Sequence, residues 1–346
     1  MTSDGAVHAR AQDLPRLTSL RAFAAIGVFG VHAQTSIRWE LGSKLFGLGY
    51  AGVGFFFILS GFILTWSTRP GGPARDFYRR RFARIYPAHL VTALIAGLAW
   101  GFGTAWSTVG NLLLIQAWDV RDSVHYGLNG ASWSLSCEAF FYLIWPITVV
   151  YAVRRRANFA ATSVLLFFAG SLIVALSLGN DAYVHAAYVN PVIRVGEFLV
   201  GIALAVYFVE RGQSHRVPVP IGLAVFAASW ELCRIFIEAK YPLPDFALFP
   251  SFVLLIWVGA QADVAKVRGL LTQPWMVYGG QVSFCFYLVH QFAIAVVVEQ
   301  HIAASGPVLF VLAFLLSCVF AAALHHLVEL PGQKYLSRGK RSRVTA

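Results

Sequence analysis

Long apolar segments recur along the whole chain and are separated by short polar connections. Each is close to the 20 or so apolar residues that a membrane-spanning helix needs. The pattern therefore predicts an all-α polytopic membrane protein with about ten transmembrane helices. The predicted helices cover residues 17–36, 47–67, 85–104, 133–153, 159–178, 191–209, 218–237, 247–262, 278–299 and 307–328.

Lysine and arginine gather in every second connection between these segments. The basic clusters are Arg10 with Arg16, Arg69 to Arg84, Arg154 to Arg156, Arg211 with Arg216, Lys266 with Arg268, and Lys334 to Arg343. Because basic residues are concentrated in cytoplasmic loops, this alternation predicts that both termini are cytoplasmic. We expect a cytoplasmic tail over residues 1–16, a transmembrane domain over 17–330 and a basic cytoplasmic tail over 331–346, with no separate soluble domain.

The longest connection predicted to face outward covers residues 105–132 and includes one apolar run too short to span. We interpret that run as re-entrant or interfacial. Five aromatic residues lie at the predicted outer edge and can stack on sugar rings, or else form an interfacial aromatic belt. They are Trp106, Trp118, Tyr126, Trp133 and Tyr183, of which Trp118, Tyr126 and Trp133 are the candidates for acceptor binding.

The composition agrees with a membrane protein. Hydrophobic residues make up 58% of the chain and charged residues 12%, against about 25% charged in soluble domains. The net charge of +11 would suggest nucleic acid in a soluble protein, but here positive-inside loops explain it. The polar N-terminal stretch precedes no small-residue cleavage site, so we expect the first apolar segment to remain as a helix.

Ionisable residues inside membrane helices are costly and are candidates for function. Arg21 and His32 lie on the first helix, eleven residues apart, which places them on nearly the same face about 16 Å apart along the axis. They can line one path although they cannot touch. The alternatives are that Arg21 is a snorkelling anchor and that His32 is satisfied by a neighbouring backbone or hydroxyl group. The remaining intramembrane ionisable residues are Glu138, Arg194, Glu197, Arg234, His290, His325, His326 and Glu329.

Three further sets of charges have a recognisable spacing or setting. Arg81 and Arg84, in ARDFYRRRFARIYP, are i, i+3 neighbours that can hold a phosphate, or are part of an ordinary positive-inside loop. A lone Glu138 needs a partner, either a cation such as His32 or a proton. The i, i+3 pair of Arg194 and Glu197 is expected to neutralise itself.

Metal chemistry is not indicated by the sequence. The four cysteines lie in apolar stretches without metal-ligand spacing and are expected to be small buried hydrophobic residues. No HExxH spacing occurs, and the adjacent His325 and His326 point to different faces of a helix.

Seven sequence elements follow one another along nearly the whole chain. They are LTSLRAFAAIGVFGVH, GVGFFFILSGFIL, FYRRRFARIYP, GASWSLSCEAFFYLIWP, IRVGEFLVGIALA, GGQVSFCFYLVHQF and LVELP. In this order they resemble the membrane-bound acyltransferase-3 family, which includes bacterial polysaccharide O-acetylases. Three positions depart from the family pattern, since Gly54 and Ala139 stand where acids are common and Gln281 where a lysine is common. Ser283, Tyr287 and His290 keep the pattern.

The resemblance implies an O-acyltransferase of the bacterial inner membrane, surrounded by lipid, that moves an acyl group from cytoplasmic acyl-CoA to a glycan hydroxyl. It implies neither a metal nor a nucleic-acid partner, and acetyl-CoA is the expected donor. By this resemblance Arg21, Arg81 and Arg84 bind the donor phosphates. His32 is the general base, or less favourably a transient acyl carrier, and Glu138 orients it or balances its charge.

Two alternatives from other classes remain at this stage. A secondary transporter or exporter of lipid-linked glycan also places ionisable groups at mid-membrane, although the inverted repeat expected of such a protein is not evident. A non-catalytic membrane subunit of the same fold is the other alternative, and the missing acids at positions 54 and 139 keep it open.

Overall fold

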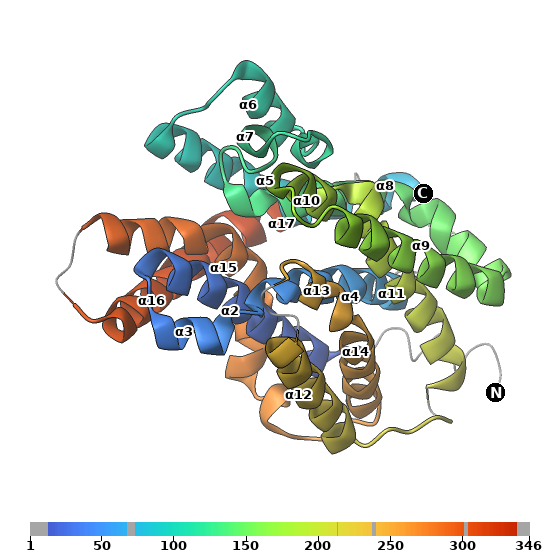
Figure 1. Cartoon of the computed structure of the whole chain (residues 1–346). Helices are drawn as coiled ribbons and strands as arrows, with labels where there is room; N and C mark the ends of the chain where they lie inside the picture. The colour runs from blue at the N-terminus through green and yellow to red at the C-terminus, as the bar shows by residue number, and fades with distance from the viewer. Residues whose placement is uncertain (1–12, 68–72, 213, 237–239, 301–303, 338–346) are drawn as a thin grey trace, which may run out of the picture.

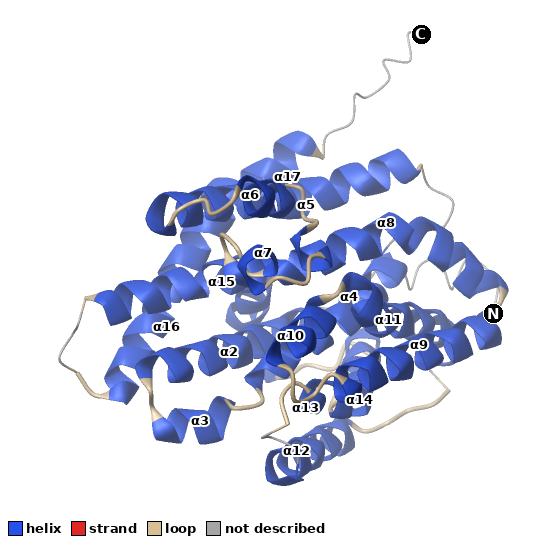
Figure 2. Cartoon of the chain, turned by 45° about the horizontal axis from the view of Figure 1, so that its top comes forward, coloured by secondary structure: helices blue, strands red, loops and turns tan. Residues whose placement is uncertain are grey.

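The computed structural model describes residues 13–67, 73–212, 214–236, 240–300 and 304–337. Most of the two expected tails lies outside these ranges. Within them the chain forms helices and connecting loops, with no strand (Figure 2). The long helices are α2 (Pro15–Ile37), α4 (Gly52–Ser67), α5 (Ala74–Trp100), α8 (Trp133–Arg154), α9 (Arg156–Leu176), α11 (Pro191–Arg211), α12 (Val219–Phe236), α14 (Phe249–Val264), α15 (Pro274–Glu299) and α16 (Gly306–Leu324).

These ten long helices correspond one to one with the ten predicted segments. In the described part of the chain, 8 helical segments are long and apolar enough to cross a membrane. Helix α2 is not among them, and it carries several polar side chains, while α14 has only 16 residues. The structure confirms an all-α polytopic membrane protein.

One predicted boundary was wrong. Helix α5 begins at Ala74 and not near residue 85, so the charged run of residues 74–84 is helical. Hydropathy alone misses this charged helical segment, because arginine is a good helix former although it is polar. An ion pair of 3.0 Å between Arg79 and Asp76 supports this first part of the helix. The i, i+3 relation of Arg81 and Arg84 therefore holds on a real helix.

Helices α2 and α15 pack along each other, beside α16 (Figure 1). Gly280 allows the close approach, because a Cβ at this position would collide with the carbonyl of Thr18 on α2. Small residues have this role in membrane bundles generally. Helix α16 flanks α15, and α11 packs between α4 and α9.

Short helices fill the connections. Those of the 105–132 connection, α6 and α7, lie together at the edge of the bundle beside α5 (Figure 1), and the connection holds no spanning helix. The last long helix passes through a π-helical turn, a feature often found at functional sites. The short elements are α3 (Glu40–Phe46), α6 (Ala105–Leu112), α7 (Asp122–His125), α10 (Asp181–Val189), α13 (Leu243–Ala247), α17 (Leu330–Leu336), the 3-10 turns η1 (Gly49–Ala51), η2 (Gln116–Trp118), η3 (Gly130–Ser132) and η4 (Leu270–Thr272), and the π-helix η5 (His325–Glu329).

Candidate active site

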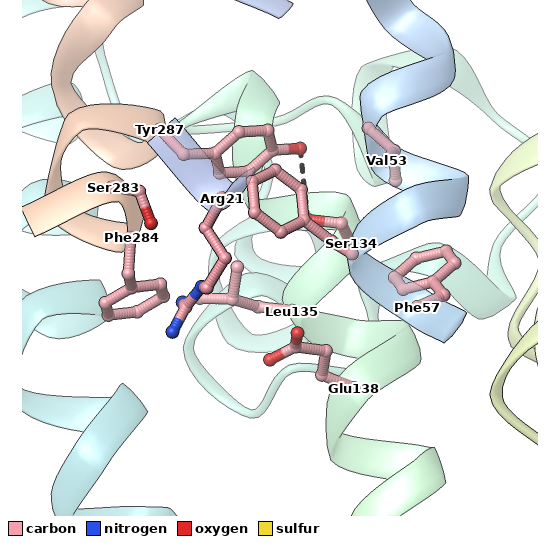
Figure 3. A pocket seen from close by; sticks show the side chains of 10 residues that line it. Arg21, Val53, Phe57, Ser134, Leu135, Glu138, Ser283, Phe284 and Tyr287 are labelled. Atoms are coloured by element: carbon pink, nitrogen blue, oxygen red, sulfur yellow. Dashed lines mark hydrogen bonds between the residues drawn. The ribbon is translucent and has the colours of Figure 1, made fainter. Parts of the chain in front are cut away.

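A small cavity of about 40 Å³, with both charged and apolar side chains in its lining, lies between α2, α4, α8 and α15. Arg21 enters it from α2 and Glu138 from α8, and the charged ends of both side chains reach into the same space (Figure 3). On the α15 side, Tyr287 accepts a hydrogen bond of 3.0 Å from the Ser134 hydroxyl. We call this space the inner pocket. Its lining is Arg21, Val53, Phe56, Phe57, Ser134, Leu135, Glu138, Ser283, Phe284 and Tyr287.

Cationic groups exceed anionic ones around the inner pocket. Among the described residues, the guanidinium of Arg21 makes no hydrogen bond or ion pair, although it lies within electrostatic reach of Glu138. The Nε of Arg81 is buried without a partner, and this side chain also lies within reach of Glu138. Glu138 accepts a hydrogen bond of 2.9 Å from the Tyr142 hydroxyl. One carboxylate facing two unpaired arginines leaves a site suited to an anion.

Arg84 is held in a different way from Arg81. It forms an ion pair of 2.8 Å with Glu329, whose side chain is completely buried in the π-helical turn η5. Glu329 also accepts hydrogen bonds from Cys285 Sγ at 3.1 Å and Gln333 Nε2 at 3.1 Å, and it contacts His325 Nδ1 at 2.6 Å. The sequence suggested that Arg81 and Arg84 can hold a phosphate as a pair, whereas the structure pairs Arg84 with Glu329 and leaves Arg81 Nε without a partner.

The same cluster is the one place in the described chain where three metal-ligand types meet. Ligand atoms of Cys285, His325 and Glu329 lie within 4.8 Å of one another. They are far apart in the sequence, so spacing rules could not find them. Each already takes part in a hydrogen bond, and Arg84 neutralises the carboxylate. The cluster therefore holds Glu329 in place, and Glu329 in turn anchors Arg84.

His32 pairs with a second intramembrane histidine. Its Nδ1 lies 2.7 Å from Nε2 of His290 on α15, and the two rings stack with centroids 5.0 Å apart. The Nδ1 of His290 lies 2.6 Å from the carbonyl oxygen of Tyr287, which can only accept a hydrogen bond. In neutral His290 the proton is therefore on Nδ1, and its Nε2 accepts the Nδ1 proton of His32. This chain of hydrogen bonds leaves Nε2 of His32 as an unprotonated base.

The His32 ring also borders an open groove of about 380 Å³ between the C-terminal halves of α2 and α15. We call it the outer groove. Tyr287 connects the two spaces, because its hydroxyl lines the inner pocket and its carbonyl holds His290. The histidine pair thus lies between them. The groove is lined by Val31, His32, Thr35, Ser36, Gln291, Ile294, Ala295, Val298 and Glu299.

The sequence suggested His32 as a partner for Glu138, but in the structure the two side chains have different partners. Glu138 lies in the inner pocket with Arg21 and Tyr142, whereas His32 is oriented by His290. Sequence reasoning did identify His290 as an intramembrane ionisable residue but did not pair it with His32. An unexplained histidine inside a helix was the available signal.

Arg194 and Glu197 form the expected ion pair, with contacts of 2.8 and 2.9 Å. The structure adds a second carboxylate, because Asp245 on α13 contacts Arg194 Nη2 at 2.8 Å. Tyr188 donates a hydrogen bond of 2.9 Å to the same Asp245 oxygen. All four side chains are buried.

The three aromatic candidates for acceptor binding have different surroundings. The Trp118 side chain is 44% exposed and meets Phe140 edge to face. Tyr126 is partly buried beside His125, with ring centroids 4.3 Å apart. Trp133 is in the core, only 6% exposed, so its ring presents little surface to an outside ligand.

Together these features define a polytopic membrane protein in which arginine, glutamate and histidine side chains converge between helices, as they do on substrate pathways. Residues 14–326 match the model of the family described as acyltransferase domain, and the chain belongs to this family of acyl-transferring enzymes. This assignment supports an acyl-transferring enzyme rather than a transporter.

Curated relatives agree with this assignment. The chain is 34% identical to "Acyltransferase MdmB" of Streptomyces mycarofaciens, over 94% of this chain and 93% of the relative. It is 26% identical to "Exopolysaccharide production protein ExoZ" of Rhizobium meliloti, over 87% of this chain and 94% of the relative. "Putative peptidoglycan O-acetyltransferase YrhL" of Bacillus subtilis is also 26% identical, over 92% of this chain and 54% of the relative. No solved structure matches the chain.

Proposed function

We propose that this protein moves an acyl group, an acetyl group in the first instance, from acyl-CoA to a hydroxyl of a glycan. The observation that carries the proposal is the histidine pair: His32 lines the open outer groove and is linked through His290 to Tyr287, which lines the cationic inner pocket. Support for the acyl group and acceptor comes from relatives named for O-acetylation and exopolysaccharide production.

The donor fits the arginines of the inner pocket and α5. Coenzyme A carries several phosphate charges, and charge-assisted hydrogen bonds from guanidinium groups suit them well. Arg21 and Arg81 have free donor capacity among the described residues, and Arg84 is fixed in place by Glu329. Glu138 limits the excess of positive charge around Arg21.

The chemistry assigned to this chain is proton transfer. His32 Nε2 removes the proton from the acceptor hydroxyl as that oxygen attacks the thioester carbonyl carbon. The carbon–sulfur bond then breaks, the thiolate leaves, and the proton on His32 neutralises it. His290 stabilises the charged form of His32 by accepting its Nδ1 proton in a hydrogen bond. A general base positioned in this way contributes a factor of about 10² to 10⁴ in rate.

The acceptor enters through the outer groove, with the exposed Trp118 and the partly buried Tyr126 as candidates for contacts at the edge of the molecule. The orientation that suits this route has both termini in the cytoplasm and places the protein in the bacterial inner membrane. The transmembrane domain over 17–330 then performs the whole reaction, with the cytoplasmic tails over 1–16 and 331–346 beside the donor.

Donor binding to the purified protein tests this function. Radiolabelled acetyl-CoA should bind to wild-type protein in detergent, and Arg81→Ala should weaken binding about tenfold, as loss of a charge-assisted contact does. Arg80→Ala is the matched control, because Arg80 is the exposed neighbour in the same run. Absence of binding at millimolar donor contradicts the proposal. Mass spectrometry of host surface glycans with and without the protein identifies the acceptor.

A further inference from the structure

A buried ion cluster lies directly behind one wall of the inner pocket. Arg194 on α11 is completely buried, and its guanidinium carbon lies 5.2 Å from the centre of the Phe57 ring. Phe57 belongs to α4 and lines the inner pocket together with Val53 and Phe56 (Figure 3). The position of Arg194 therefore bears on the shape of that wall. A desolvated cation over an aromatic face is an attractive contact.

Two carboxylates hold Arg194, and they come from different elements. Glu197 lies one turn further along the same helix and makes two contacts with the guanidinium. Asp245 comes from α13, a helix of five residues in a connection between long helices, and makes the third contact. Of these two acids only Asp245 ties Arg194 to another element, and Tyr188 fixes its carboxylate.

The Asp245 carboxylate occupies the space that a side chain at position 54 would need. A Cβ built on Gly54 would overlap Asp245 Oδ1 and would lie 3.0 Å from Glu197 Oε1. Gly54 is on α4, three residues before Phe57. Glycine at this position thus makes room for a carboxylate that arrives from α13. A carboxyl group carried by residue 54 itself would point into the same cluster.

We propose that Asp245 is a positioning residue whose carboxylate, accommodated by Gly54, holds Arg194 against Phe57 and so sets the α4 wall of the donor pocket. The inference rests on the proposed function, because it assigns the inner pocket to the acyl-CoA donor. The cluster needs one carboxylate in this space, and a side chain at position 54 can supply it in place of Asp245.

A reciprocal exchange tests the proposal, using the variants Asp245→Ala, Gly54→Asp and the double variant in purified full-length protein. Breaking a buried ion pair from one side is strongly destabilising, so we expect Asp245→Ala to lower the melting temperature and to weaken acetyl-CoA binding about tenfold. Gly54→Asp alone should be equally harmful, since two carboxylates then compete for one space. The double variant should recover both properties to within about threefold in affinity, because the two changes are coupled.

Asp263→Ala is the matched control. It breaks another buried ion pair, with Arg16 at 3.0 Å, in which neither residue lines the inner pocket. We expect it to lower the melting temperature while donor affinity stays unchanged. If Asp245→Ala fails to insert, Asp245→Asn retains a partner for Tyr188 and removes only the charge.

Two results would overturn the proposal. One is a double variant at least as impaired as the worse single variant, which would show that position 54 cannot replace Asp245. The other is an Asp245→Ala protein that melts earlier but binds donor as the wild type does, which would make the cluster purely structural. If wild-type protein binds no donor while the double variant still recovers its melting temperature, the exchange stands and the proposed function is wrong.

Discussion

His32 Nδ1 lies 2.7 Å from His290 Nε2, and this contact joins residues 258 positions apart in the chain. It joins α2 to α15, with His32 on the outer groove and His290 one turn beyond Tyr287, which lines the inner pocket. Because the Tyr287 carbonyl sets the tautomer of His290, the orientation of His32 depends on a backbone atom of α15. His32, the proposed base, is thereby held by the packing of α2 on α15.

Removing His290 should impair catalysis without impairing donor binding. In His290→Ala, His32 loses the acceptor that orients its ring, and we expect kcat to fall about 10²-fold with an unchanged KM for acetyl-CoA. Steady-state kinetics of the purified protein measures both values. His326→Ala is the matched control, since that histidine is exposed and contacts Tyr278 instead. A wild-type kcat in His290→Ala would contradict the assigned orientation.

Glu329 and Arg84 should act as one unit in donor binding. Glu329→Gln weakens the anchor of Arg84, so we expect each of Glu329→Gln and Arg84→Ala to raise the Kd for acetyl-CoA several-fold. The double variant should be little worse than the worse single variant, because contacting residues are not additive. Donor binding measured on the wild type, the two single variants and the double variant completes this double-mutant cycle. Fully additive losses would show that the two residues act independently.

The long helices could be predicted because each span must carry enough apolar residues to be stable in lipid. The start of α5 could not be predicted in this way, since hydropathy does not register a charged helical segment. Helical periodicity predicted that Arg21 and His32 share a face of α2, and the structure adds that Arg21 lines the inner pocket and His32 the outer groove. Pairings between distant helices have no local signature, and the His32–His290 contact is of this kind.

The burial of Asp245 could not be predicted from the sequence either. It lies in a short connection outside the predicted spans, where an acid is expected to be solvated, and yet it is buried against Arg194. The sequence did contain one clue. The family resemblance implies an acid at position 54, where this chain has glycine, and the structure places the Asp245 carboxylate beside it.

Narrowing the outer groove should affect the acceptor alone. Ala295 lines this groove on α15, so Ala295→Phe should raise the KM for the acceptor at least several-fold while leaving the Kd for acetyl-CoA unchanged. Transfer to a glycan acceptor and donor binding are measured on the same preparation. Val296→Phe is the control, because Val296 follows Ala295 on α15 but has an exposed side chain that does not line the groove. A loss of donor affinity in Ala295→Phe would show that the groove takes the donor.

Acid should loosen the α7 region. Burial lowers the pKa of His125 below its ordinary value of 6.5, with nearby Asp122 opposing this effect and His185 adding to it. The unfolded chain then binds more protons below pH 6.5, so this contribution to stability is complete above pH 6.5 and is lost as the pH falls. The protection of the amides of residues 105–126 against hydrogen exchange, expressed relative to the intrinsic exchange rate at each pH, should therefore fall between pH 7 and 5. In His125→Phe this loss of protection should disappear, and its persistence would assign it to another group.

His32 is proposed as the base for acyl transfer and not as a donor-binding residue. Single-turnover transfer from radiolabelled acetyl-CoA, measured alongside donor binding on wild type and His32→Gln, separates these two roles. We expect unchanged donor affinity in His32→Gln and transfer slowed by a factor of about 10² or more. Transfer at the wild-type rate, or loss of donor binding in a correctly folded His32→Gln protein, would contradict it.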